Sequence, residues 1–356
     1  MNNPCHPLCI DEKLFHVAVV DFMEPHAAKK FTDSLKNTGF AVLTGHPVSN
    51  ELIQRVYAEW RDFMNHLHQA YEAGEDGNVA LKYFRDLNTQ HGYFPMAASE
   101  KAKNAKVKDI KHYFQLYFPH GQYPSEVSDD ARKLWGELFD LGKTLVGWID
   151  EHMPPEIKAT IQKKIGKDRT LADCVSGDKT MLRVLHYPGY LDSEGEAGAV
   201  RAAAHEDINL ITVLPAGSAR GLQVKSNQSG DWYEVPLVEG SIVINVGDMM
   251  QEMSEHAYIS TTHRVIKMDD GNVNDDGVAA VAEDGRAQFL SGDRMSTPCF
   301  IHLKENCPLS SRYGSAQHYL IERLVALGVV PPNALDRMLE QYPGGVMSGW
   351  ENDVCE

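Results

Sequence analysis

The spacing of apolar residues changes part-way along the chain. In the first half, apolar positions recur every three or four residues, which is typical of helices with one buried face. Three segments have this spacing: Ala27–Leu35, a stretch from Ser49 or Asn50 to about Leu67, and Asp129 to about His152. Shorter β-rich runs lie at Val17–Phe22 and Gly39–Leu43. We therefore predict a first half that is mixed but mainly helical.

From about Met181 the apolar period becomes two, and Gly, Pro, Asn and Asp separate short runs. Strands at such density predict a sandwich, barrel or jelly roll. The pattern returns to helical after Ser315. The predicted fold class is mainly β with flanking helices (α+β). The expected strands are Met181–Tyr187, Ile208–Leu214, Gly221–Val224, Trp232–Val235, Ser241–Val246, Arg264–Met268 and Ser296–Leu303.

These parts look interdependent, so we predict one domain over residues 1–356. Its parts are an N-terminal region (1–175), a β core (176–307), and C-terminal helices with a tail (308–356). An acidic insertion, 269–285, interrupts the core. Its first Asp and Asn residues have calcium-loop spacing, but Asp275 stands where that loop needs Gly and Val281 where it needs Glu. We interpret it as a surface insertion.

Charge and cysteine content narrow the class of protein. With 34 Lys and Arg against 50 Asp and Glu, the net charge is −16, which disfavours nucleic acid and anionic membrane surfaces as partners. No signal peptide or apolar run of about 20 residues is visible. The six cysteines are too scattered for a disulfide framework, and Cys5-His6 with Cys9 lacks the second half of a zinc site. We expect a reduced, cytoplasmic protein.

The most informative polar cluster is His205-Glu206-Asp207. On an extended strand, residues two apart share a face, so His205 and Asp207 can bind one ion. His263 begins a later strand, 56 residues beyond Asp207. Two imidazoles and one carboxylate leave coordination positions open, which suits non-haem Fe(II), whereas structural zinc needs a closed tetrahedron.

A second set of residues predicts an anion site. By alternation Arg294 and Ser296 share a strand face and offer a guanidinium and a hydroxyl to one carboxylate. Tyr187 ends an earlier strand and can add a phenol donor. Arg286 is the competing arginine, but it lacks the partner hydroxyl two residues on.

At this point the sequence resembles the isopenicillin N synthase-like branch of the 2-oxoglutarate/Fe(II)-dependent dioxygenases. The resemblance covers most of the chain and keeps the family order. The matching pieces are "VAVVDF", "GFAVLTGHPVSNELIQRVYAEWRDFM", "HGYFP…SEKAK…KDIKHYF", "RVLHYPG", "AHEDINLITVL", "GLQV…GDWYEVP", "SIVINVGDMM", "STTHRV" and "DRMSTPCF". Arg294 lies 31 residues beyond His263, farther than is usual in the family, and the excess maps onto the acidic insertion.

The resemblance implies a double-stranded β-helix (jelly-roll) core with Fe(II) held by three ligands. These are His205, Asp207 and His263. It also implies that 2-oxoglutarate binds the iron and places its distal carboxylate on Arg294 and Ser296, assisted by Tyr187. In such enzymes O2 converts the cosubstrate to succinate and carbon dioxide, and the oxidant hydroxylates, desaturates or cyclises a small-molecule substrate.

Three alternative functions stay open, one of them a zinc hydrolase, although no general base or nucleophile is identified near the three ligands. In oxidases of the same family that use no 2-oxoglutarate, the residues corresponding to Arg294 and Ser296 bind a substrate carboxylate instead. A jelly-roll binding protein without catalysis is a third interpretation, although such a protein should lack ligands that are present here.

Substrate contacts are predicted less sharply, and neither the substrate nor an oligomeric state follows from the pattern. Arg183 lies four residues before Tyr187 on the same face, and either contacts substrate or forms a structural ion pair. The resemblance places one aromatic segment on the substrate side: Tyr93, Phe94, Phe114 and Tyr117. We interpret Asp248 as a turn residue, His256 as a surface loop residue, Lys101–Lys111 as a solvated face and Cys299 as core.

Overall fold

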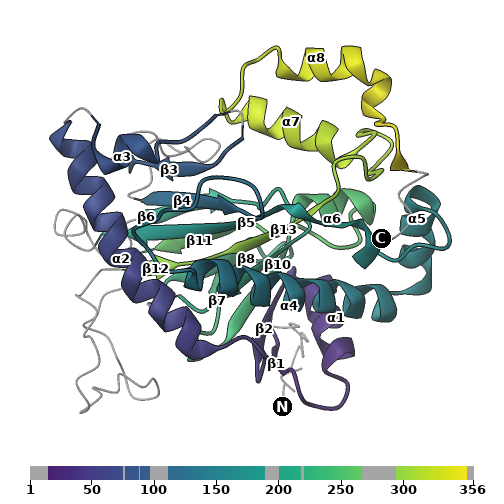
Figure 1. Ribbon diagram of the computed structural model, residues 1–356. Coiled ribbons are helices and arrows are strands. Elements are labelled where there is room, and N and C mark those ends of the chain that lie inside the picture. The colour runs from purple at the N-terminus through teal and green to yellow at the C-terminus, as the bar shows by residue number, and fades with distance from the viewer. Residues whose placement is uncertain are drawn as a thin grey trace, which may run out of the picture.

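The computed structural model describes residues 15–74, 77–87, 89–96, 111–188, 200–217, 220–266 and 294–350. Within them the strands form two facing sheets, and helices cover the outer face of the larger sheet (Figure 1). The largest cluster of buried apolar residues takes members from Val20 through Trp350. Its members come from the N-terminal, β-rich and C-terminal parts of the chain alike.

The larger sheet has nine strands among the described residues, in the order β1-β2-β10-β7-β13-β5-β4-β3, with β12 also paired to β5. All its pairs are antiparallel except β1 with β2. Its strands are β1 (Val19–Asp21), β2 (Phe40–Thr44), β3 (Gly92–Phe94), β4 (His112–Tyr117), β5 (Val175–Tyr187), β7 (Ile211–Pro215), β10 (Ile242–Val246), β12 (Arg294–Ser296) and β13 (Cys299–Leu303).

The smaller sheet has the order β6-β11-β8-β9. Its strands are β6 (Val200–His205), β8 (Leu222–Lys225), β9 (Trp232–Glu234) and β11 (His263–Ile266). Strand β6 was not predicted, because the run VRAAAH has a single β-branched residue and three alanines, a composition that is not typical of strands. The strands expected after Met181 are present, although β5 begins six residues before its predicted start and one run is split in two. Residues 267 and 268, at the end of the predicted strand Arg264–Met268, lie outside the described residues.

That split divides the expected strand Ser296–Leu303 into β12 and β13. The residues between them are Thr297 and Pro298. Proline has no N–H for the strand ladder, so the pairing is interrupted at this point. Both pieces still pair with β5, β12 near its end and β13 nearer its start.

Helices α1 (Ala27–Thr38), α2 (Asn50–Ala73) and α4 (Asp130–His152) cover the larger sheet (Figure 1). Ser49 caps α2, since its hydroxyl accepts from the Leu52 amide at 3.2 Å. Helix α4 packs closely on the sheet, because a Cβ on Gly142 would lie 2.6 Å from the Ile301 side chain. The first half also contains β3 and β4, which the mainly helical prediction did not delimit.

Shorter helices complete the described chain. They are α3 (Val79–Lys82), α5 (Pro155–Ile165), α6 (Asp248–Met253), α7 (Ala316–Ala326) and α8 (Ala334–Gln341), with 3-10 turns at Ala172–Cys174 and Pro343–Gly345. Pro155 opens α5 where the sequence predicted the end of the preceding helix. In the described part of the chain, no helix has the length and apolar character needed to cross a membrane.

Candidate functional site

A cavity of about 870 Å³ lies between the two sheets. Strands β4, β5, β7, β10, β12 and β13 line it on one side and β6, β8 and β11 on the other, while α7 contributes to its rim. The metal-ligand and anion-site candidates all line it, together with two of the substrate candidates. They are His205, Asp207, His263, Arg294, Ser296, Tyr187, Arg183 and Tyr117.

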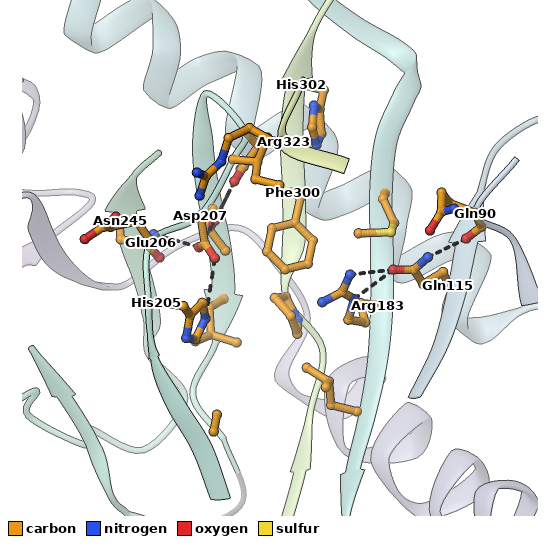
Figure 2. Close-up of a pocket in the computed structure, with 18 of the residues that line it drawn as sticks. Gln90, Gln115, Arg183, His205, Glu206, Asp207, Asn245, Phe300, His302 and Arg323 are labelled. Atoms are coloured by element: carbon orange, nitrogen blue, oxygen red, sulfur yellow. Dashed lines mark hydrogen bonds and ion pairs between the residues drawn. The ribbon is translucent and has the colours of Figure 1, made fainter. Parts of the chain in front are cut away.

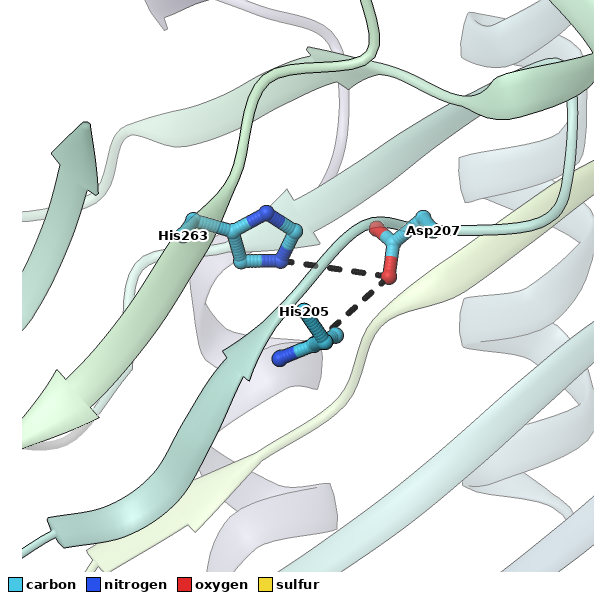
Figure 3. A group of neighbouring side chains, drawn as sticks. All are labelled: His205, Asp207 and His263. Carbon is cyan, nitrogen blue, oxygen red and sulfur yellow. Dashed lines mark ion pairs between the residues drawn. The ribbon is translucent and has the colours of Figure 1, made fainter. Parts of the chain in front are cut away.

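Three of these side chains converge on one point (Figure 3). His205 ends β6 and His263 begins β11, and the two positions pair directly across the smaller sheet. Asp207 follows in the turn after β6. Its Oδ1 lies 3.7 Å from Nε2 of His205 and 3.8 Å from Nε2 of His263. One donor atom from each residue lies within 4.8 Å of the others, so the three could hold a single metal ion.

Both imidazoles are oriented by their own strands. His205 Nδ1 lies 2.7 Å from the Ala203 carbonyl oxygen, and His263 Nδ1 lies 3.1 Å from that of Thr261. A carbonyl oxygen only accepts, so each Nδ1 carries the proton and donates. The lone pair of each ring is therefore on Nε2, the atom that faces Asp207, as a metal ligand requires.

The carboxylate of Asp207 is oriented by the larger sheet. Its Oδ2 accepts from the Thr212 hydroxyl at 2.6 Å and from the Asn245 amide at 2.8 Å. Thr212 on β7 and Asn245 on β10 are direct neighbours in the strand register. These two donors occupy Oδ2, and Oδ1 is left facing the imidazoles. Sequence reasoning missed this contact, because the contact depends on the register.

The loop that carries Asp207 is anchored at the start of α6. The Asp248 amide donates to the Asp207 carbonyl at 2.7 Å, and the Gly247 amide donates to that of Leu210 at 3.0 Å. A Cβ on Gly247 would lie 2.0 Å from the backbone oxygen of Asn209. Only glycine permits the loop and α6 to approach this closely.

Burial and neighbouring charges set the protonation states here. Burial, together with His263, lowers the pKa of His205 to about 4. Burial alone would raise the pKa of Asp207, but the two imidazoles and the bonds from Thr212 and Asn245 hold it below its ordinary value. At neutral pH His205 is therefore neutral and Asp207 ionised, the forms that bind a metal.

The predicted anion site lies on the adjoining wall of the cavity. Arg294 on β12 pairs directly with Tyr187 on β5, donates to its phenol, and holds its guanidinium carbon 5.4 Å from the ring centre. Ser296 lies on the same strand, and Arg294 and Ser296 are each only 3% exposed. Burial lowers the pKa of Arg294 but leaves it a cation. A desolvated guanidinium beside a hydroxyl fits the carboxylate of a bound ligand.

Sequence reasoning missed Gly217, which makes room for this guanidinium. A Cβ at that position would lie 2.6 Å from Nη2 of Arg294 and 3.0 Å from its Cζ. Glycine is needed here for space, since no positive φ is recorded at this residue. The sequence offers no signal for this contact, because the two residues are far apart along the chain.

The substrate-side predictions divide according to the two faces of β4. Tyr117 and Arg183 line the cavity. Tyr93 and Phe114 are fully buried outside the cavity. They therefore do not line it, contrary to the prediction that they contact substrate. The two are register partners between β3 and β4 and face the helices, with Phe114 packed against Trp60 of α2. Phe94 is buried as well and does not line the cavity.

The structure adds cavity residues that were not predicted. Gln115 shares the face of Tyr117, Phe300 and His302 alternate along β13, and Arg323 reaches in from α7 (Figure 2). Alternation along the strands was the available signal. It could not show which face turns inward, since that depends on how the sheets pack.

Other candidates occupy structural or surface positions. Asp248 accepts from Tyr319 at the start of α6, and His256 is 62% exposed in a loop, as predicted. Cys299 is fully buried, which confirms its interpretation as core. The acidic insertion 269–285, Arg286, Cys5, Cys9 and the lysines from 101 to 108 lie outside the described residues.

Two family models match the sequence. One, described as the 2OG-Fe(II) oxygenase superfamily, covers residues 179–302, and the other, described as the N-terminal region of non-haem dioxygenases in morphine synthesis, covers 17–138. A 2-oxoglutarate-dependent dioxygenase from Didymella fabae is 37% identical over 255 residues, which are 65% of this chain and 71% of that protein. This chain belongs to the 2OG-Fe(II) oxygenase superfamily.

Solved structures agree with this membership. A candidate oxygenase from Shewanella oneidensis is 37% identical with a TM-score of 0.67, over 88% of this chain and 99% of that one. A Neurospora crassa protein, solved in complex with alpha-KG and thymine, is 19% identical with a TM-score of 0.62, over 87% and 96% of the two chains, and shows the shared fold. Feruloyl CoA ortho-hydroxylase 2 from Arabidopsis thaliana is 25% identical over 261 residues, 72% of this chain and 66% of that protein.

Membership of the 2OG-Fe(II) oxygenases confirms the broad predictions. The core is the expected jelly roll, and the protein is an oxidoreductase that uses Fe(II), 2-oxoglutarate and O2. The donor set of His205, Asp207 and His263 has the chemistry that Fe(II) needs, two imidazole nitrogens and one carboxylate.

Proposed function

We propose that this 2OG-Fe(II) oxygenase oxidises a small organic molecule, and we assign its site residues as follows. His205, Asp207 and His263 hold Fe(II), while Arg294 and Ser296, assisted by Tyr187, bind the distal carboxylate of 2-oxoglutarate. When bound, the iron and 2-oxoglutarate supply the oxidising chemistry, in which O2 converts the cosubstrate to succinate and carbon dioxide. The observation that carries the assignment is that all six side chains line one cavity.

In this proposal the side chains position the cofactor and cosubstrate and fix their charge. The Nδ1 hydrogen bonds of His205 and His263 keep both Nε2 atoms aimed at one point. Asp207 supplies the negative charge, and its contacts with Thr212 and Asn245 keep one oxygen aimed inward. Three protein ligands leave positions for cosubstrate and oxygen.

The cavity walls also restrict access of water. Apolar side chains from both sheets line it between the polar groups: Leu185, Leu214, Leu222 and Val265. Excluding water strengthens the electrostatic contacts inside and protects a reactive oxidant from side reactions. A volume of about 870 Å³ shared between cosubstrate and substrate fits a small molecule.

We also infer that nucleic acid and membrane surfaces are not partners and that the protein works in the cytoplasm. The net charge of −16 supports the first inference. Within the described residues Cys174, Cys299 and Cys307 are all free thiols, which suits a reducing compartment.

The direct test is cosubstrate turnover. Protein loaded with Fe(II) under nitrogen is given isotopically labelled 2-oxoglutarate, then O2, together with a panel of metabolites, and labelled succinate is measured. We expect succinate above the level of a His205→Ala variant. Fe(II) titration of the wild type and of Asp207→Ala should show binding that is lost in the variant.

His256→Ala is the matched control for the loss of a histidine. That side chain is exposed and outside the cavity, so Fe(II) binding and succinate formation should be unchanged. Wild-type protein that forms no more succinate than His205→Ala with any metabolite, and binds Fe(II) no better than Asp207→Ala, would overturn the proposal.

A further inference from the structure

A row of side chains runs along one wall of the cavity. Every second residue from Arg294 to His302 lines the cavity, first on β12 and then on β13, and the residues between them do not. The row begins with Arg294 and Ser296, which we assign to the distal carboxylate of 2-oxoglutarate. It ends with Phe300 and His302, and Figure 2 shows these two rings one after the other along β13.

The carboxylate of Asp207 is held next to Phe300, between the two ends of this row. Phe300 pairs directly with Thr212 on β7, and the Thr212 hydroxyl donates to Asp207 at 2.6 Å. Under the proposed assignment, 2-oxoglutarate extends from Arg294 toward this point. The other end of the row is therefore left for the primary substrate, and there His302 lies two residues, or roughly 7 Å, beyond Phe300.

The imidazole of His302 faces the cavity without a bonded neighbour. Its backbone amide donates to the Thr180 hydroxyl at 3.2 Å, but its ring has no hydrogen-bond partner among the described residues. Burial lowers the pKa of His302 to about 4, with Lys179 and Arg183 acting in the same direction and Asp207 in the opposite one. The ring is therefore neutral near pH 7 and has one donor and one acceptor nitrogen. Because buried polar groups are normally hydrogen-bonded, a molecule that fills this end must offer the ring a partner.

Helix α7 borders the same end of the cavity with an apolar face. Its first turn is joined to the segment just after β13, since the Gln317 backbone amide donates to the Glu305 carbonyl at 3.0 Å. Beyond Gln317, the apolar positions that line the cavity follow at spacings of three and four, which puts them on one face of the helix. These α7 leucines are Leu320, Leu324 and Leu327. They are only partly buried, so their apolar surface is available to a ligand.

Building on the proposed function, we propose that the primary substrate carries an uncharged hydroxyl or amide group that binds His302, on a mainly apolar skeleton that packs against the α7 leucines. A hydroxyl or an amide can both donate and accept, so it can pair with a neutral imidazole in either tautomer. The reacting carbon then lies between His302 and Arg294, next to the proposed metal ligands. His302 in this role binds and positions the substrate.

The test measures how much one polar group contributes to binding. Matched probes are titrated calorimetrically into protein held under nitrogen with saturating Fe(II) and 2-oxoglutarate: benzyl alcohol with toluene, and 2-phenylethanol and 2-phenylacetamide with ethylbenzene. The ratio of the two affinities in each pair isolates the polar group, because the aromatic part is shared. In His302→Phe we expect this ratio to fall at least about fivefold for one pair or more, since the buried polar group loses its partner.

Two further variants separate a hydrogen bond from a change of shape. His302→Asn keeps a donor and an acceptor, so it should restore at least part of the ratio. His120→Phe replaces another histidine of the cavity wall, one that is exposed, and should leave the ratio at the wild-type value. Benzoate is titrated in parallel, because Lys111, Arg183 and Arg323 also line the cavity.

Several results would overturn the inference. Equal ratios in the wild type and His302→Phe for every pair would show that His302 makes no such bond. An equal fall in His120→Phe, or no recovery in His302→Asn, would show that the effect is not a hydrogen bond at this residue. Benzoate that binds more tightly than every polar probe, and equally well to His302→Phe, would mean that the site takes an anion. Absence of measurable binding by every probe would also contradict a site of this chemistry.

Failure of the proposed function gives a different result. Protein that takes up neither Fe(II) nor 2-oxoglutarate contradicts the site assignment, whatever the titrations show. The same probe titrations on metal-free protein then still decide the role of His302, because they measure binding and not turnover.

Discussion

At the scale of single residues, the anion site depends on Gly217, which has no side chain to displace the Arg294 guanidinium. In Gly217→Ala the new Cβ would lie 2.6 Å from Arg294 Nη2, so the guanidinium must move. We expect the affinity for 2-oxoglutarate to fall about tenfold, or roughly 1.4 kcal/mol, with Fe(II) affinity unchanged. Equilibrium titration measures both. Gly136→Ala, at a position in α4 with open space around it, is the control, and unchanged 2-oxoglutarate affinity in Gly217→Ala would contradict this account.

A second prediction at this scale concerns the orientation of Asp207. Thr212→Val keeps the side-chain shape but removes the hydroxyl that donates to Oδ2 at 2.6 Å. Partners that orient a metal ligand typically contribute about 10–100-fold in metal affinity, and we expect a loss of that order for Fe(II). Thr144→Val, on an exposed part of α4, should bind Fe(II) like the wild type. Equal Fe(II) affinity in the two variants would show that Asn245 alone suffices.

The metal-ligand and anion-site candidates were predictable because their signals are local. His205 and Asp207 are two residues apart, as are Arg294 and Ser296, and the order of motifs along the chain linked them to His263. The contacts of Asn245 and Gly217 were not predictable, because they join distant strands and loops. Which residues touch Oδ2 of Asp207 is set by strand register, and periodicity within one strand does not report register.

At the scale of elements, the errors in the substrate-side predictions share a cause. The strands of the larger sheet that line the cavity have one face toward the helices and one toward the cavity, and both faces carry large side chains. On β4, Phe114 faces the helices and Gln115 the cavity. Aromatic character alone cannot choose between these faces, which is why Tyr93 and Phe114 were placed on the wrong side. Helices were easier to predict, since each buries one apolar face against the sheet.

A buried hydrogen bond joins helix α7 to α6. The Tyr319 hydroxyl donates to Asp248 Oδ2 at 2.5 Å, and burial raises the pKa of Asp248. Tyr319→Phe removes the donor and leaves a buried carboxylate under-satisfied, so we expect a loss of about 1–3 kcal/mol in the free energy of unfolding. Urea unfolding measures it, with Tyr342→Phe, where the tyrosine is less buried, as the control. A Tyr319→Phe variant as stable as the control would mean that apolar packing alone docks α7.

At the scale of the whole molecule, the two sheets enclose positively charged side chains within a strongly acidic protein. The chain carries a net charge of −16, yet Arg183, Arg294 and Arg323 all line the cavity. The sheets enclose these cations together with the carboxylate of Asp207, and the helices bury the opposite face of the larger sheet. The same packing also buries histidines on both sides of the larger sheet, and their burial makes stability depend on pH.

His112 on β4 is fully buried on the helix side of the sheet. Its Nδ1 is hydrogen-bonded to the Tyr93 hydroxyl at 3.1 Å, and its Nε2 to Nδ1 of His186 at 2.8 Å. Burial, followed by the nearby His186 and His68, holds the pKa of His112 well below its ordinary value. In the unfolded chain the pKa returns to about 6.5. The unfolded state therefore takes up a proton near pH 6.5, while the folded state does not.

Stability should consequently be greatest above pH 6.5 and fall as the pH drops toward 5. Each histidine kept neutral by folding contributes a slope of up to about 1.4 kcal/mol per pH unit, and His302, with a pKa of about 4, adds to that of His112. Urea unfolding of metal-free protein between pH 7.5 and 5 measures the slope. His112→Asn should be less stable at pH 7.5 but lose less on acidification, because the depressed pKa is gone. Parallel curves for the two proteins would show that His112 titrates alike in the folded and unfolded states.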